Sequence, residues 1–307
     1  MIMITGSRGL IGSATAKRLT AAGHTVRTFD IADDPSQDSR RPGVWSEVLD
    51  GVDGVIHLAA VSRVVWAESD PDRTQATNVD ALEGLLAAAA ATPRPPWVVF
   101  ASSREVYGEP TILPVAESAP LAPLNVYARS KVAGETMVLA AAAQGLVANI
   151  ARFSNVYGCI HDHHDRVVPA FARATATGGV MRIEGADHMF DFTHIEDVSR
   201  GLHLLVDATA RGDRLDPIHF VTGRGTTLAQ LADIALQVGD GRVTKQLAPP
   251  RSYDVARFTG DPRQARDTLG WTAQIGIEEG FAGLVEAFSL AGLQCAEAPT
   301  VQRAAHG

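Results

Sequence analysis

Apolar stretches of strand length alternate with stretches of helix length through the first half of the chain. The strand-length runs are residues 1–5, 25–29, 54–59, 97–102 and 147–153, and the helix-length stretches are residues 10–22, 74–91 and 127–144. Strands that alternate with helices form βαβ units, whose strands pair in parallel. The pattern predicts an α/β fold with a doubly wound parallel sheet.

The pattern changes after Gly158. A loop rich in His and Asp is followed by a helix near residues 168–177 and by short segments, such as 223–227 and 248–251, that glycine and proline separate. We therefore expect a nucleotide-binding domain over residues 1–157, rejoined by about 190–222. A smaller, interleaved C-terminal substrate domain is expected over residues 158–307. The small, polar tail from Ala296 is assigned no function.

Composition and charge narrow the function classes. The 307 residues are 46% hydrophobic and 20% charged, which is typical of a globular protein. The net charge is -8 without a basic block, so nucleic-acid binding is not expected. No apolar run of about 18 residues and no signal peptide is evident, and a cytoplasmic protein without membrane contact is expected. Cys159 and Cys295 lack the spacing of a zinc site or a disulfide framework.

A glycine-rich turn follows the first strand. Residues 2–5 run into Gly6-Ser-Arg-Gly9-Leu-Ile-Gly12 and then a helix. Glycines at these places allow a tight turn, close approach of the backbone to a pyrophosphate, and close helix packing, while the helix N-terminus attracts the anion. A glycine turn can also be merely a turn, but its place after a buried strand predicts a Rossmann-type dinucleotide site.

Asp30 indicates which dinucleotide binds. It closes the second strand, where a carboxylate accepts hydrogen bonds from the adenosine ribose and repels a 2′-phosphate. NAD is therefore predicted rather than NADP. Two alternatives stay open: Asp30 as a solvated carboxylate at a strand end, and the nearby Arg27 as a base that tolerates a phosphate.

Tyr127-Ala-Arg-Ser-Lys131 places two side chains one helical turn apart. A tyrosine pKa near 10 has to fall by roughly three to serve as an acid or base near neutrality, which corresponds to about 4 kcal/mol. One ammonium about 5 Å away supplies roughly 3 kcal/mol at an effective dielectric near 20. The positive nicotinamide ring of NAD could supply the remainder. The spacing predicts oxidation of an alcohol, although by itself it also fits an exposed helix face.

Six sequence blocks occur along the chain in the same order as in a known enzyme family. They are residues 5–12, His57-Leu-Ala-Ala60, Ser102-Ser-Arg-Glu-Val-Tyr-Gly108, residues 127–131, Arg152-Phe-Ser-Asn155 and residues 191–198. With these blocks the chain resembles the extended short-chain dehydrogenases/reductases that act on nucleotide sugars, a family of 4-epimerases, 4,6-dehydratases and uronate decarboxylases. The resemblance spans about residues 1–285, ending with Leu269-Gly-Trp271 and a final helix.

The resemblance implies further site residues. Ser103 corresponds to the residue that bonds the reacting hydroxyl beside Tyr127. Asp38 and Ser39 correspond to a pair that contacts adenine after the family's third strand. Asn155 corresponds to a residue that contacts the substrate diphosphate. For Asn78, a cofactor contact and a helix cap are equally good interpretations. The predicted cofactor-binding residues are Gly6, Gly9, Leu10, Ile11, Gly12, Asp30, Asp38, Ser39, Leu58, Ala59, Ala60, Asn78, Tyr127, Lys131 and Phe153.

The resemblance leaves the reaction open. A 4-keto sugar can be reduced again on its other face, lose water, or lose carbon dioxide. Glu105 resembles the catalytic base of the 4,6-dehydratases, but the acid before it is replaced by Arg104, which cannot donate that proton. The leading hypothesis is a nucleotide-sugar 4-epimerase using Ser103, Tyr127, Lys131 and NAD. The alternatives are a dehydratase or decarboxylase that uses Glu105, and, less favoured, a non-catalytic NAD-binding regulator.

Substrate recognition departs from the family at one position. Phe190 stands where many relatives have an arginine that holds the diphosphate, and Arg166 and Arg251 are candidates to supply the charge instead, with solvated surface arginines as the alternative. Arg104 could bind a substrate carboxylate or pair with Glu105 or Glu109.

The remaining expectations concern metals and assembly. The cluster His161-Asp-His-His-Asp165 has metal-ligand residue types, but no metal is predicted because hydride transfer with NAD needs none. His57 and His194 are expected to be structural. By resemblance, a homodimer should form through the helices at residues 74–91 and 127–144, whose Ala-rich faces allow close packing.

Overall fold

A computed structural model describes residues 1–249 and 255–297, and of 293–297 only the backbone. Its centre is a six-stranded parallel sheet with the order β2-β1-β3-β4-β5-β9. The strands are β1 (Ile2–Thr5), β2 (Val26–Phe29), β3 (Gly54–His57), β4 (Trp97–Ser103), β5 (Ala148–Phe153) and β9 (Ile218–Phe220). The predicted doubly wound α/β fold is confirmed.

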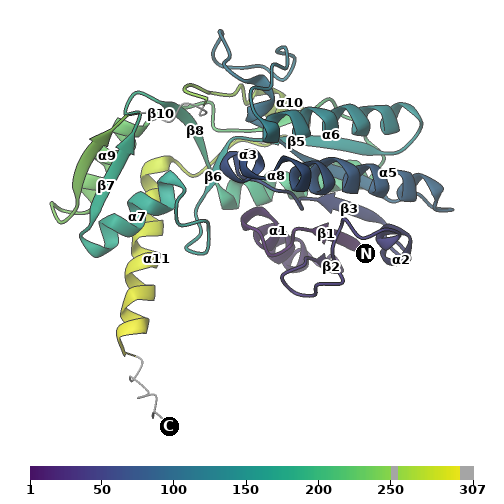
Figure 1. The fold of residues 1–307 in the computed structure, drawn as a ribbon, viewed down its shortest axis with the longest axis horizontal. Coiled ribbons are helices and arrows are strands. Elements are labelled where there is room, and N and C mark those ends of the chain that lie inside the picture. Colours follow the sequence, from purple (N-terminus) through teal and green to yellow (C-terminus); the bar gives the residue numbers. More distant parts are fainter. Residues whose placement is uncertain (250–254, 298–307) are drawn as a thin grey trace.

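Helices cover both faces of this sheet (Figure 1). The helices α1 (Leu10–Ala21), α8 (Ile195–Ala210) and α10 (Arg263–Leu269) contribute to the core on one face, and α2 (Val44–Val48), α5 (Ala81–Ala91) and α6 (Val126–Ala143) to the core on the other. Successive residues of a strand point to opposite faces. Ile4 accordingly packs with the first group and Met3 with the second, and both are fully buried.

Two segments differ from the predicted elements. The stretch predicted as one helix over residues 74–91 comprises α4 (Pro71–Gln75), a π-helical turn η1 (Ala76–Asp80) and α5, preceded by α3 (Val64–Ser69). Residues 30–43 form turns and loops without a strand. Asp38 and Ser39 therefore follow β2 directly and not a third strand, because this short, polar segment has no apolar run to pair with a sheet edge.

A smaller group of elements packs beside the large sheet (Figure 1). Its three-stranded sheet has the order β10-β8-β6, and a two-stranded parallel sheet pairs β11 with β7. The strands are β6 (Asn155–Tyr157), β7 (Val180–Glu184), β8 (Met189–His194), β10 (Gly225–Thr227) and β11 (Thr244–Ala248), and the helices are α7 (Val167–Thr177), α9 (Leu228–Val238) and α11 (Ile277–Glu297). Phe171, Leu231 and Phe281 are central to their common core. Between these elements the chain returns to the large sheet as α8 and β9.

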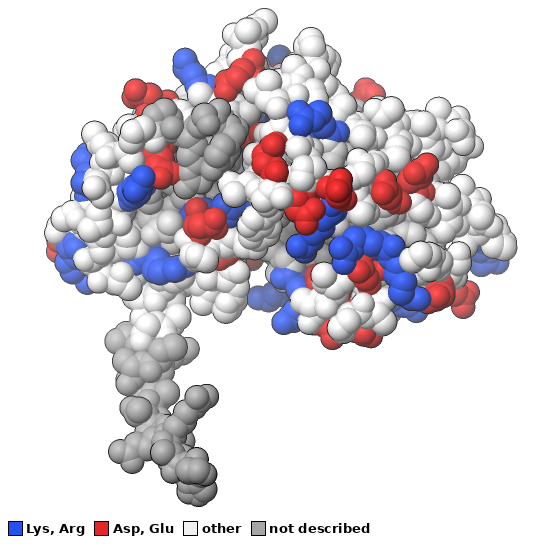
Figure 2. Space-filling model, viewed as in Figure 1, with Lys and Arg blue, Asp and Glu red and all other residues white. Residues whose placement is uncertain are grey.

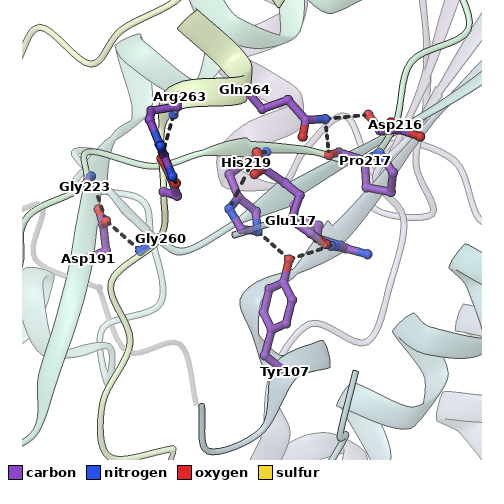
Figure 3. Close-up of polar contacts among 12 residues, drawn as sticks. Tyr107, Glu117, Asp191, Asp216, Pro217, His219, Gly223, Gly260, Arg263 and Gln264 are labelled. Atoms are coloured by element: carbon purple, nitrogen blue, oxygen red, sulfur yellow. Dashed lines mark hydrogen bonds and ion pairs between the residues drawn. The ribbon is translucent and has the colours of Figure 1, made fainter. Parts of the chain in front are cut away.

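Separate groups of buried polar contacts lie around Asp191 and around Tyr107 and His219 (Figure 3). The Asp191 carboxylate on β8 accepts hydrogen bonds from the backbone of Thr222, Gly223 and Gly260 at 2.8, 2.9 and 3.3 Å. The Tyr107 hydroxyl lies 2.6 Å from Nε2 of His219 on β9. Burial raises the pKa of Asp191 and lowers that of His219 to about 3. These groups hold the loops around the sheet ends in place and are structural.

Charged side chains of both signs are interspersed on the face drawn in Figure 2. In the part of the chain that the structure describes, no helix is both long and apolar enough to span a bilayer.

Candidate active site

A cavity of about 1370 Å³ lies at the carboxyl ends of the sheet strands, between the large sheet and the smaller group of elements. Ligands of doubly wound folds bind in this position, where strand order reverses on either side of β1. The cavity collects every predicted cofactor-binding residue except Asn78, and also Ser103, Arg104, Glu105, Asn155 and Arg166. Arg251, the remaining predicted substrate contact, lies outside the described residues.

The glycine turn is closed tightly against the ends of β1 and β3. Gly6 has a φ of +66°, and a Cβ there would lie 2.7 Å from the Ala59 nitrogen. A Cβ on Gly12 would lie 2.2 Å from the Gly6 carbonyl oxygen. Gly9 caps the start of α1 without a side-chain hydrogen bond, so the first backbone N–H groups of the helix are available to an anion. The turn therefore has the geometry that a pyrophosphate requires.

Asp30 lies beside this turn. Its carboxylate accepts hydrogen bonds from the Arg8 and Ala32 nitrogens, each at 2.9 Å, which fixes it at the end of β2. Arg27 donates to the Val48 carbonyl at 2.8 Å and does not line the cavity. The arrangement fits an adenosine ribose at Asp30. Asp38 also lines the cavity, where Arg40 holds it in an ion pair at 2.6 Å.

Asn78 is the one predicted cofactor-binding residue that does not line the cavity, and its contact with the cofactor stays a prediction. It lies in η1, is 2% exposed, and bonds the backbone nitrogen of Val61 at 2.8 Å and the Ser130 hydroxyl at 2.9 Å. It does not cap a helix either. A buried amide with donor and acceptor partners on two elements holds the loop after β3 against α6, so its role is to position the cavity wall.

Ser103, Tyr127 and Lys131 meet at the centre of the cavity. Ser103 ends β4, and Asn125 caps α6 by accepting from the Ala128 nitrogen at 2.8 Å, which sets Tyr127 in the first turn. Ser103 and Tyr127 both line the cavity, and the polar interaction between them favours the ionised form of Tyr127. The Lys131 ammonium donates to the Ala101 carbonyl at 2.8 Å and lies 5.7 Å from the Tyr127 ring centroid.

The protonation of this group differs from the prediction. Burial raises the pKa of Tyr127 to about 12, against the opposing interaction with Ser103, and burial lowers the pKa of Lys131 to about 8, against the opposing charge of Glu135. The expected fall in the tyrosine pKa is therefore wrong for the protein alone. Desolvation outweighs the opposing effects of Ser103, Arg166 and Arg104, because the cavity walls remove the Tyr127 hydroxyl from water.

Arg104 and Glu105 form an ion pair in the cavity wall, with 2.8 Å between Nη2 and Oε1. The Glu105 Oε2 accepts from Asn125 at 3.2 Å. The Arg104 guanidinium also lies over the Phe190 and Phe258 rings, at 4.9 and 5.7 Å from their centroids. The sequence leaves Arg104 open between a substrate carboxylate, Glu105 and Glu109, and in the structure it pairs with Glu105.

Sequence reasoning missed Arg63 and Trp66 in the cavity wall and Glu135 outside it. Arg63 and Trp66, after β3, line it and contact Asp165 and His163 from the loop before α7. Glu135, behind Lys131, binds Arg152 at 2.6 Å and Ser102 at 2.5 Å. The only signal in the sequence was the proximity of these residues to the blocks at 57–60 and 127–131.

Metal-type residues gather away from the cavity. Within the described ranges, the loop at 161–165 forms no group of three possible ligands, whereas His24, His203 and Asp207 do so where α1 meets α8. Both histidines lie near Asp207, at 3.8 and 3.7 Å, which accounts for this group without an ion. His57 bonds Thr5 at 3.0 Å, and the His194 ring accepts from the Glu196 nitrogen at 3.3 Å, so both have structural roles.

Comparison with known proteins agrees with this geometry. The model of the NAD dependent epimerase/dehydratase family matches residues 2–222. The UDP-glucose 4-epimerase of Streptomyces lividans is 29% identical over 300 residues, which cover 88% of this chain and 90% of that enzyme.

Two solved structures are similar over nearly the whole chain. The structure of MoeE5 in complex with UDP-glucose and NAD is 30% identical, with a TM-score of 0.85 and coverage of 95% of this chain and 99% of that one. The structure of TunA, an NAD-dependent NDP-hexosamine 5,6-dehydratase, is 29% identical, with a TM-score of 0.82 and coverage of 93% and 96%.

Proposed function

Because this chain belongs to the NAD-dependent epimerase/dehydratase family, we propose that it is an NAD-dependent nucleotide-sugar 4-epimerase. The observation that carries the proposal is the meeting of Tyr127, Ser103 and Lys131 in one cavity with the glycine turn. The UDP-glucose 4-epimerases among its relatives support the reaction and the substrate class. A non-catalytic regulator would have no use for this acid/base group.

The residues act on a sugar hydroxyl at C4. Tyr127, as the tyrosinate, takes the hydroxyl proton, and Ser103 can bond the same hydroxyl from the end of β4. Lys131 stabilises the tyrosinate that accepts this proton. When bound, NAD would accept the hydride from C4 and return it later. The 4-keto sugar rotates in the site so that its other face is reduced, and Tyr127 gives the proton back. The configuration at C4 therefore inverts without net redox change.

Glu105 favours the epimerase over the lyase alternative. An elimination would use the Glu105 carboxylate to take a proton from C5, and here that carboxylate is engaged in the cavity wall as an acceptor for Arg104 and Asn125. Arg104 itself cannot protonate a leaving hydroxyl. A dehydratase stays the second candidate because Glu105 lines the cavity two residues from Ser103, and because a 5,6-dehydratase is similar in structure.

Product analysis tests the proposal. The purified protein is incubated with UDP-glucose and with UDP-glucuronate, with and without added NAD, and the products are examined by mass spectrometry and proton NMR. An epimerase gives a product of unchanged mass with an inverted C4 coupling. Loss of water or carbon dioxide would assign the chain to the Glu105 lyase class instead.

The pH dependence should follow the Tyr127 and Lys131 pair. Since the pKa of Lys131 is lowered to about 8 and that of Tyr127 raised to about 12, the first proton leaves the pair near pH 8. Neutral Lys131 can then accept the Tyr127 proton, which makes Tyr127 a base. The pair regains its proton as pH falls through 8, and Tyr127 can then no longer act as a base. We expect kcat/KM to rise between about pH 7 and 9. In Lys131→Met the rise should move to higher pH, and an unchanged profile would contradict this assignment.

Assembly and location complete the proposal. A homodimer through α5 and α6 is proposed, since their surfaces are rich in alanine and Leu139 on α6 is 49% exposed. A cytoplasmic location stays a prediction.

A further inference from the structure

Two contacts cross the cavity between the loop after β3 and the loop before α7. Arg63 and Asp165 form a two-pronged ion pair, with Nη1 to Oδ1 at 2.6 Å and Nη2 to Oδ2 at 2.8 Å. Trp66 and His163 pack edge to face with centroids 4.8 Å apart. All four residues line the cavity. Neither the fold nor the acid/base group requires this crossing, so it calls for a separate explanation.

The two partners of the ion pair are buried to different degrees. The Arg63 side chain is 12% exposed, and its guanidinium lies 5.8 Å from the Trp66 ring centroid. The Asp165 side chain is 50% exposed. Arg63 is therefore the fixed partner, with two N–H groups of its guanidinium directed at an anion. Asp165 is the partner whose carboxylate water can solvate when the ion pair opens. A planar guanidinium held in this way suits a phosphate as well as a carboxylate.

The position of Arg63 suits the diphosphate of a nucleotide sugar. The glycine turn and Asp30 line the half of the cavity that fits NAD, so a substrate whose sugar lies at Tyr127 has to extend its nucleotide toward α7 and β7. Arg63 follows β3, whose end carries the predicted cofactor-binding residues 58–60, and Asp165 precedes α7, so their ion pair links the two sides. Arg166, beside Asp165, lines the same wall and acts electrostatically on Tyr127.

Strand β8 contributes no arginine or lysine to the cavity. Phe190 there is 7% exposed and packs under Arg104, which is itself paired with Glu105. Arg166 is 3.6 Å from the Asp162 carboxylate, so an internal carboxylate accompanies it just as Asp165 accompanies Arg63.

We propose that Arg63 binds the diphosphate of the nucleotide-sugar substrate, and that Asp165 occupies the same guanidinium until the substrate displaces it. The proposal rests on the proposed function for its substrate class. It makes Arg63 a binding residue and Asp165 a competitor that lowers substrate affinity. The two partners of one ion pair should therefore have opposite effects when each is replaced.

Calorimetric titration of UDP into the NAD-saturated protein tests this directly. Arg63→Gln should weaken UDP binding by about tenfold or more, the loss expected for a charge-assisted contact. Asp165→Asn should strengthen UDP binding several-fold. In turnover assays KM should change in the same directions while kcat stays nearly constant. Arg211→Gln, which breaks the exposed pair with Asp213 away from the cavity, is the matched control and should change neither.

Several results would overturn the proposal. If both variants weaken UDP binding alike, the ion pair is only a structural clasp. If Arg63→Gln weakens NAD binding and leaves UDP unaffected, Arg63 serves the cofactor diphosphate. Should Arg63→Gln fail to fold, Arg63→Lys keeps the charge without the fork, and unchanged UDP affinity in it counts against the proposal. Absence of binding of UDP, dTDP and GDP to the unaltered protein would also reject it. UDP binding without epimerisation would reject only the proposed function.

Discussion

Replacement of Tyr127 by phenylalanine is expected to lower turnover by about 10²- to 10⁴-fold, the usual contribution of a positioned general acid or base. The ring stays in place beside Lys131, and only the hydroxyl that faces the cavity is lost. NAD binding and thermal stability should stay close to those of the unaltered protein, because the phenyl ring fills the same space. Steady-state kinetics with UDP-glucose, NAD titration and a thermal melt measure the three quantities.

Tyr107→Phe is the matched control for this substitution. The Tyr107 hydroxyl is buried, lies 2.6 Å from His219 and accepts a hydrogen bond from Arg152 at 2.5 Å, and Tyr107 does not line the cavity. Its loss removes the partner of His219 Nε2 and one of the two acceptors of Arg152 Nη1, which still donates to the Glu117 carbonyl at 2.7 Å. The loss should cost about 1–3 kcal/mol of stability. Tyr127→Phe should thus lose catalysis and keep stability, while Tyr107→Phe loses stability. A Tyr127→Phe protein with near-normal turnover would remove the acid/base role.

Gly12→Ala should weaken NAD binding. The added Cβ would lie 2.2 Å from the Gly6 carbonyl oxygen and 2.8 Å from the Ser7 Cα, and both are backbone atoms of the turn that cannot move aside alone. The start of α1 has to shift away from the turn, which separates the helix N–H groups from the pyrophosphate position. Overpacking of this kind costs about 1–3 kcal/mol, so NAD affinity should fall by roughly 5- to 150-fold.

Gly283→Ala controls for the alanine itself. Gly283 is exposed on α11, and an added Cβ meets no atom within 4 Å. Since alanine favours a helix over glycine by about 0.5–1 kcal/mol, this variant should bind NAD normally and be slightly more stable. Equal NAD affinity in Gly12→Ala and the unaltered protein, measured by titration, would show that the turn does not hold the pyrophosphate.

Regular elements with strong apolar patterns were predictable because their signals are local. The five predicted strands and the helix at residues 10–22 agree with the structure to within a few residues, since period and length are encoded by neighbouring side chains. Short strands such as β6 and β10 were not predicted individually. A run of three residues has no periodicity of its own, and its pairing with β8 decides that it is a strand.

The sequence by itself determined the glycine turn, Asp30 at the end of the second strand, and the Tyr127 and Lys131 spacing, because each depends on a few neighbouring residues. The tertiary structure decided the rest. It paired Arg104 with Glu105 over Phe190, turned Asn78 away from the cavity, and joined Arg63 to Asp165 across 102 positions. It also set the pKa of Tyr127 above its usual value, since desolvation depends on every wall of the cavity at once and no short stretch of sequence encodes it.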